Sequence, residues 1–292
     1  MEKIIDDNTT YYLPECIYSH FFWHFVKDLI KNKNNFEKQT SYVTTGIIGF
    51  ITNFFDTLGI GSFAPLTASL RGLKQIQDKH LPGTLNVSVT IPVMIEALAF
   101  ITIIEVEKFT LIFMVLAALI GSFFGAGIIS KLPEKTINRI LGFALLATAF
   151  LMTSGQMGWI KALGVGSEIG LEGLKLVFAV IVNVILGALQ ASGLGMYAPS
   201  MALVYLLGLS PKVAFPIMMA SSAFALPSAS IRYVKEKAYN RKASLAISLT
   251  GIAGVLIAAF IVKSLPIYIL TWLVVVVILY ASITLLIAGF KD

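Results

Sequence analysis

The sequence has few charged residues and a single cysteine. Of its 292 residues, 13% are charged and 57% are hydrophobic, whereas a soluble domain is roughly 25% charged. Cys16 alone cannot form an internal disulfide, a CxxC redox pair or a thiolate metal cluster. The shortage of charge argues against a water-soluble core, and the lone cysteine excludes functions that need paired thiolates.

The sequence also lacks a cleavable signal peptide pattern, because Asp, Glu and Lys recur through its first 40 residues. Apolar runs such as 140–152, 247–262 and 267–289 follow. Several approach or exceed the roughly 20 residues with which a helix crosses a hydrocarbon core. We therefore expect an all-α, polytopic membrane protein that inserts through its own first membrane segment.

No nucleophile–base pair, metal-ligand cluster or nucleotide motif is present, so we expect neither an enzyme nor a cofactor. His20 and His24 stand at i, i+4, but no carboxylate or cysteine accompanies them as a further metal ligand. The net charge of +6 comes from basic residues in short loops between apolar runs, not on one face. Nucleic acid is therefore not an expected partner.

Residues 1–40 form a polar N-terminal arm with one amphipathic stretch. Apolar side chains recur there at helical spacing, opposite a polar and basic stripe. We expect this stretch to be a helix lying on the membrane surface. The apolar stripe consists of Tyr18, Phe22, Phe25 and Leu29, and the polar stripe of His20, His24, Lys27 and Lys31.

From Ser41 onward the chain contains ten apolar segments and an internal repeat. An offset of 134 residues aligns glycines and prolines without a gap, which predicts repeats at 41–155 and 172–292 joined by a linker at 156–171. The aligned pairs are Gly59 and Gly193, Gly61 and Gly195, Ala64 and Ala198, Pro65 and Pro199, and Pro82 and Pro216. The segments are 42–58, 62–70, 82–104, 109–130, 136–155, 172–190, 194–209, 211–232, 243–263 and 267–289.

Each repeat contains a Gly-x-Gly that interrupts an apolar stretch, followed four residues later by a proline. Such a stretch reads as helix, break, helix, and it is either one interrupted crossing or a re-entrant hairpin. Hairpins place 17 of the 22 lysines and arginines on the cytoplasmic side, and the positive-inside rule favours that topology. We expect two inverted repeats, each of one broken re-entrant hairpin and three transmembrane helices, with both termini cytoplasmic.

Two inverted hairpins would bring their tips together near the bilayer midplane. Free N–H groups and helix dipoles at the restarted helices suit a small anion. Neighbouring hydroxyls and amides can either complete an anion site or only link helices. The expected substrate-binding residues are Gly59, Gly61, Ser62, Thr84, Asn86, Ser192, Gly193, Gly195, Ser221 and Ser222.

Ionisable groups are expensive inside a bilayer unless they face a cavity, a partner or a proton path. Asp56 lies three residues before Gly59, and its repeat mate is the neutral Gln190. Glu96 lies within the segment 82–104. We expect Asp56, Gln190 and Glu96 to serve in coupling or gating, and the alternative is that they hydrogen-bond locally and fix the shape of the hairpin tip.

The stretch DTLGIGSF followed by LPGTLNV, with a second glycine motif one repeat later, resembles the sulfite exporter TauE/SafE family. The resemblance covers about residues 41–290, and the polar arm departs from the family pattern. It implies a duplicated helical membrane fold that moves sulfite, sulfoacetate or related organosulfur anions across the cytoplasmic membrane.

We therefore expect a secondary transporter in the lipid bilayer of the cell membrane with a small anion as its substrate. A passive anion channel is the main alternative, because it can share the hairpins without any coupling residue. A membrane enzyme or a scaffold for sulfur metabolism is the weaker one. A homodimer is left open, because no motif decides the oligomeric state.

Overall fold

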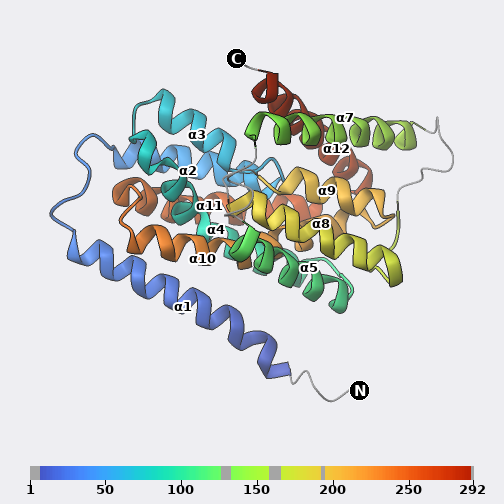
Figure 1. Ribbon diagram of the computed structural model, residues 1–292, viewed down its shortest axis with the longest axis horizontal. Coiled ribbons are helices and arrows are strands. Elements are labelled where there is room, and N and C mark those ends of the chain that lie inside the picture. Colours follow the sequence, from blue (N-terminus) through green and yellow to red (C-terminus); the bar gives the residue numbers. More distant parts are fainter. Residues whose placement is uncertain (1–6, 126–132, 158–165, 192–194, 291–292) are drawn as a thin grey trace.

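The computed structural model describes residues 7–125, 133–157, 166–191 and 195–290, which form an all-α protein (Figure 1). Within these ranges there are eleven α-helices, two short 3-10 helices and one π-helical turn. The 3-10 helices are η1 (Asp78–His80) and η3 (Pro211–Val213), and the π turn is η2 (Gly121–Gly125). The α-helices are α1 (Asp7–Lys31), α2 (Tyr42–Thr57), α3 (Phe63–Gly72), α4 (Leu81–Ile103), α5 (Lys108–Ile120), α7 (Glu134–Gln156), α8 (Gly173–Ala191), α9 (Tyr197–Leu206), α10 (Ala214–Lys235), α11 (Arg241–Ser264) and α12 (Ile267–Phe290).

Six helical stretches of the described chain are long and apolar enough to cross a membrane. Their number agrees with the expectation of six spanning helices, but one of the six is a different segment from the one expected. Five of them coincide with segments expected to span. The sixth is α8, which was expected to be the first leg of a hairpin, whereas the described part of the expected span 109–130 is a shorter apolar helix at 108–124. The six stretches are 78–103, 135–156, 173–191, 211–235, 241–264 and 268–290.

The chain returns, after α3, to the place where α2 begins. The Thr40 hydroxyl donates a hydrogen bond to the Gln75 carbonyl, and the backbone N–H of Ser41 donates to the Gln75 side chain, both at 2.8 Å. Helices α2 and α3 therefore form a hairpin whose tip is the break between Thr57 and Phe63.

Helices α8 and α9 return in the same way at the opposite end of the central helices. Lys175, in the first turn of α8, donates from Nζ to the carbonyl of Leu207, just after α9, at 3.1 Å. The backbone N–H of Ser210 donates to the carbonyl of Glu168 at 2.8 Å. The two hairpins thus enter the helical body from opposite ends.

Helices α4 and α10 pack against each other at the centre of the molecule (Figure 1). Helix α2 packs against α11, α5 against α8, and α7 against α12. Glycine makes the tightest of these contacts possible, because a Cβ on Gly187 of α8 would lie 2.1 Å from the carbonyl oxygen of Ala118 of α5. Small residues at such crossings are the usual means of close helix packing in membranes.

Helix α1 packs across α10 instead of standing free of the bundle (Figure 1). Phe21 and Phe25 are buried against Tyr239 and its neighbours. Phe22, expected on the apolar face, is 57% exposed, and Phe21 takes its place. The Tyr18 hydroxyl donates to the carbonyl of Ala223 in α10 at 2.6 Å.

A buried ion pair fixes the C-terminal part of α1 to the start of α11. Arg241 Nε lies 2.6 Å from Asp28 Oδ2, and both side chains are largely buried. The Tyr239 hydroxyl donates to the same carboxylate oxygen at 2.7 Å. Burial and the neighbouring carboxylate raise the pKa of Tyr239, so its hydroxyl keeps its proton and remains a donor.

The described part of the linker between the halves is held by the N-terminus of α5. Glu107 caps α5 by accepting hydrogen bonds from the backbone N–H groups of Phe109 (2.8 Å) and Thr110 (2.6 Å). Its own backbone N–H donates to the carbonyl of Ile169 at 2.9 Å. Burial is the largest single effect and raises the pKa of Glu107. The hydrogen bonds to its carboxylate lower the pKa by more in total, so the net shift is downward.

We predict that Gly187→Ala destabilises the protein by about 1–3 kcal/mol, the usual cost of forcing extra atoms into a packed contact. Gly72→Ala is the matched control, because no atom lies within 4 Å of a Cβ at that position. Thermal unfolding in detergent measures both. Equal stability of Gly187→Ala and the parent chain would contradict the close α5–α8 contact.

We predict that Glu107→Gln lowers stability at pH 7 by about 1 kcal/mol, as expected for a weakened helix cap. The folded-state pKa of Glu107 lies below its ordinary value of 4.5. The stabilisation is therefore fully present above about pH 4.5 and is lost as the pH falls through the folded-state pKa. Unfolding midpoints of the two proteins should converge in acid, and a constant difference down to pH 3 would argue against the charged cap.

Candidate functional site

A small cavity lies where the tips of the two hairpins meet. Its volume is about 30 Å³. The first tip turns through Gly59 and Gly61, whose φ angles of +96° and +85° are ones that glycine adopts without strain. In the second tip, α8 ends at Ala191 and α9 begins at Tyr197.

The lining of this central cavity follows the repeat. Each hairpin contributes four residues, and the four from the second lie 134 positions after the four from the first. They are Asp56, Gly61, Ser62 and Phe63 in one hairpin and Gln190, Gly195, Met196 and Tyr197 in the other. Helix α4 adds Val89 and Val93, and α10 adds Ser222 and Leu226.

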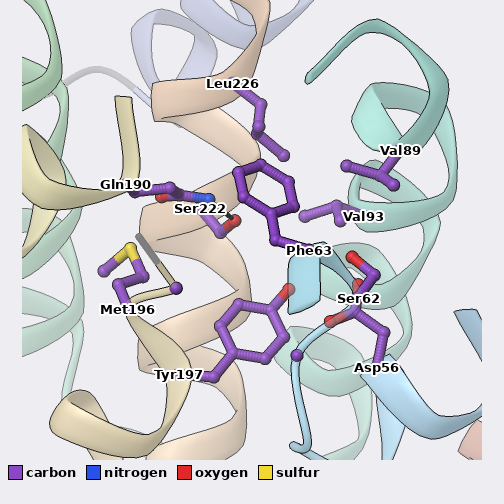
Figure 2. A pocket seen from close by; sticks show the side chains of 12 residues that line it. Asp56, Ser62, Phe63, Val89, Val93, Gln190, Met196, Tyr197, Ser222 and Leu226 are labelled. Carbon is purple, nitrogen blue, oxygen red and sulfur yellow. Dashed lines mark hydrogen bonds between the residues drawn. The ribbon is translucent and has the colours of Figure 1, made fainter. Parts of the chain in front are cut away.

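Polar groups face one another across the cavity (Figure 2). Asp56 and Ser62 lie on one side, and Gln190 lies on the other, where its amide donates to the Ser222 hydroxyl. The Tyr197 hydroxyl and the Phe63 ring project between them. The cavity is therefore polar on two opposite walls and partly filled by an aromatic ring.

Two buried oxygen atoms at this cavity lack a partner among the described residues. They are Oδ2 of Asp56 and Oε1 of Gln190, on side chains that are 2% and 5% exposed. An unpaired buried acceptor costs about 1–3 kcal/mol. The site therefore has unused capacity for a ligand, a proton or water that brings N–H or O–H donors.

Glu96 lies behind the lining and joins three helices. Its Oε1 accepts a hydrogen bond from the Thr57 hydroxyl of α2 at 2.9 Å, and its Oε2 accepts one from the Tyr197 hydroxyl of α9 at 3.1 Å. Glu96 itself belongs to α4 and is fully buried. A change at this carboxyl group would reach both hairpin tips.

Among the residues that the structure describes, no lysine or arginine lines the central cavity. Helices α3 and α9 both begin at it, and neither has a side-chain cap at Ser62 or Met196. No side-chain cap occupies the N–H groups of their first turns, and the positive ends of both helix dipoles meet there. These dipoles and neutral donors favour an anion without a fixed counter-ion.

The structure brings six of the expected site residues together and places the others elsewhere. Gly61, Ser62, Gly195, Ser222, Asp56 and Gln190 line the central cavity. Gly59 lies beside Met201 and Met218, and Glu96 lies behind the lining. Ser192 and Gly193 lie outside the described residues.

Thr84, Asn86 and Ser221 do not line the cavity. Thr84 accepts a hydrogen bond from the backbone N–H of Asn240 at 2.9 Å, and Asn86 donates to the carbonyl of Pro82. Ser221 accepts a hydrogen bond from Asn183 of α8 at 3.0 Å. All three hydrogen-bond within the bundle, which is the structural alternative for such groups.

Six residues that line the central cavity were not expected from the sequence. For one of them, Tyr197, the internal repeat contains a signal. They are Phe63, Val89, Val93, Met196, Tyr197 and Leu226. Tyr197 follows Gly195 by two positions and aligns with Phe63, which follows Gly61 by two. The same 134-residue offset that pairs the glycines therefore also pairs Phe63 with Tyr197.

No group of three metal-ligating side chains occurs within the described parts of the chain. His20 and His24 contact each other edge to face on α1, with ring centroids 4.5 Å apart. Burial, then His20 and nearby lysines, lowers the pKa of His24. This pair belongs to the outer helix and not to the central cavity.

Residues 16–152 match the family described as sulfite exporter TauE/SafE. No curated protein and no solved structure matches the chain. The match begins within α1, so the arm from residue 16 onward belongs to the family pattern instead of departing from it, and it ends within α7, before the second half.

We predict that Tyr197→Phe lowers stability by about 1–3 kcal/mol, because it leaves a buried oxygen of Glu96 without its donor. Tyr205→Phe is the matched control on the same helix, since none of the hydrogen bonds of the described residues involves the Tyr205 hydroxyl. Thermal unfolding of both variants tests the contact. Equal losses in the two would show that the Glu96 hydrogen bond contributes nothing specific.

Proposed function

With residues 16–152 assigned to the sulfite exporter TauE/SafE family, we propose that this multi-pass membrane transporter carries a small sulfur oxyanion or organosulfonate by a secondary, proton-coupled mechanism. The observation that carries the proposal is the central cavity, where four residues from each hairpin tip meet. Sulfite and sulfoacetate-like anions are the substrates that the family assignment favours.

The proposed architecture is a pair of inverted repeats. Under the 134-residue offset, the α2–α11 contact corresponds to the α8–α5 contact, and the α4–α11 contact corresponds to α10–α5; all four pairs pack together. The hairpins enter from opposite ends, as inversion requires. Rocking of one repeat against the other would then expose the cavity to each side in turn.

The proposed orientation places both termini in the cytoplasm. The basic loop residues after α3 and after α10 lie at the same end of the bundle as the C-terminal part of α1, as the contact between Asn240 and Thr84 and the ion pair of Asp28 with Arg241 indicate. The positive-inside rule assigns this end to the cytoplasmic side of the cell membrane.

The cavity would bind the anion with neutral donors. The uncapped starts of α3 and α9 offer backbone N–H groups, and the Ser62, Ser222 and Tyr197 hydroxyls are within the lining or at its edge. Such donors hold an anion without burying a counter-ion. Binding would be weak enough to allow release on the far side.

Asp56 would couple the anion to a proton. Its free Oδ2 is an acceptor when ionised and would repel an anion, but protonation turns the carboxyl group into a donor. Anion and proton would then occupy the cavity together and move together. Gln190, the neutral mate of Asp56, would bind the anion on the opposite wall through the second N–H of its amide, since the first donates to Ser222, and it would do so without titrating.

We predict that Gly195→Leu reduces sulfite uptake into proteoliposomes at least about tenfold, because the side chain fills the cavity without straining a positive φ angle. No atom lies within 4 Å of a Cβ there, and its φ is not positive, unlike that of Gly61. Gly72→Leu is the control, since it adds the same side chain in open space outside the cavity. Equal flux in the two variants would argue against transport through this site.

We predict that Asp56→Asn abolishes the stimulation of sulfite uptake by an imposed proton gradient, because an amide cannot carry the proton. Uptake driven by the sulfite gradient alone is the comparison in the same vesicles. Sulfite flux that does not depend on the proton gradient, and that is equal in the parent and in Asp56→Asn, would indicate a passive anion channel instead.

A further inference from the structure

A second and larger cavity opens where α4 ends and α10 begins, at the end of the bundle opposite the C-terminal part of α1. Its volume is about 280 Å³, close to the lower limit of typical small-molecule sites. Lys212 and Lys263 line it together with the hydroxyl-bearing Ser167 and Ser210 and the carboxylate of Glu105. We refer to it as the lysine cavity.

The lysine cavity carries a net positive charge. Among the ion pairs of the described residues, none involves Lys212 or Lys263. The lining thus contains two lysines and two serines but a single acidic residue. Charge of one sign in a cleft with low-dielectric walls concentrates ions of the opposite sign. The chemistry suits a small oxyanion or sulfonate.

The lysine cavity lies in line with the central cavity along the two central helices. Lys212 precedes Ser222 by ten residues on η3 and α10, and Ile103 follows Val93 by ten on α4. At 1.5 Å per residue, each separation is about 15 Å along the helix. One end of each helix therefore lines the lysine cavity, and its middle lines the central cavity.

An aromatic pair lies between the two cavities. Phe100 of α4 and Phe215 of α10 stack with ring centroids 5.2 Å apart, and both are fully buried. Phe215 lies three residues from Lys212 and seven from Ser222, and Phe100 lies three from Ile103 and seven from Val93. A stacked, dry aromatic contact at this position would block a hydrated anion.

We propose that the lysine cavity is an extracytoplasmic anion-binding vestibule and that the Phe100–Phe215 stack is the gate between it and the central cavity. Lys212 and Lys263 attract and hold the sulfonate or oxyanion group, and Glu105 limits its affinity. The gate is closed in this structure. The inference rests on the proposed transport function but adds a second anion site and a barrier that the function does not require.

Charged cysteine reagents test the vestibule without measuring transport. In a Cys16→Ser background, Ser167→Cys reports on the lysine cavity and Val93→Cys on the central cavity. Intact spheroplasts are treated with impermeant methanethiosulfonates, the anionic sulfonatoethyl and the cationic trimethylammonioethyl form. The ratio of anionic to cationic labelling rates at Ser167→Cys measures the local potential, and the anionic reagent is itself a small sulfonate.

Replacing Lys212 and Lys263 with Gln should lower this ratio about tenfold, in keeping with the focusing effect of a charged cleft. Replacing both with Arg should retain it, and Glu105→Gln should raise it. Lys175→Gln is the matched control, because it removes a lysine at the same end of the bundle that does not line the cavity. An unchanged ratio in the double Gln variant would overturn the vestibule, as would labelling of Ser167→Cys only in inside-out vesicles.

The gate has its own expected result. Val93→Cys should resist labelling from outside while both rings are present, and Phe100→Ala or Phe215→Ala should raise its rate at least about tenfold. Phe100→Leu, which keeps the core more nearly filled, separates gating from unfolding. Fast external labelling with both rings intact would refute the gate. Labelling that behaves as expected in a protein without sulfite flux would retain the vestibule and reject the proposed substrate.

Discussion

Backbone polar groups inside a bilayer must find partners within the protein, and this constraint governs the centre of the molecule. A helix that breaks at membrane depth leaves N–H and C=O groups unpaired unless the break is enclosed. The first break is closed locally, since the N–H of Gly59 donates to the carbonyl of Asp56 at 2.7 Å and that of Ile60 to Phe55 at 3.2 Å. The start of α3 has no side-chain cap, and its residues Ser62 and Phe63 line the cavity.

Enclosing the breaks requires the paired helices α4 and α10. They supply apolar walls at Val89, Val93 and Leu226, and through Glu96 they also anchor the hairpin tips. A carboxyl group that accepts from both Thr57 and Tyr197 makes the positions of the two tips depend on each other. The hairpins and central helices thus act as one unit, although the hairpins come from opposite ends.

The sequence predicts the helix breaks well because glycine and proline act locally and recur at the same offset. It does not predict which neighbour each side chain faces, because that depends on the rotation of the helix about its axis. Ser221 and Ser222 are neighbours, yet about 100° of rotation turns the first toward α8 and the second into the cavity. Phe21 and Phe22 differ in the same way on α1.

The sequence also does not show how deep a residue lies along the bilayer normal, and the predicted positions of Thr84 and Asn86 were wrong for this reason. Thr84 and Asn86 follow the first hairpin in sequence, but the ten residues of α3 carry the chain about 15 Å away from the tip before α4 begins. Their hydroxyl and amide groups therefore lie at the end of the bundle and not at its middle. The role of Tyr197 depended on a contact with Glu96, which is 101 residues away in sequence.

The ion pair between α1 and the start of α11 also sets when α1 can dock during synthesis of the protein. Asp28 and Arg241 are 213 residues apart, so at roughly 5–20 residues per second the arm emerges about 10–40 s before its partner. During that interval Phe21 and Phe25 have neither Tyr239 nor Val234 to cover them. The first helix made is thus among the last to dock, and its docking marks a chain whose second half has already been inserted.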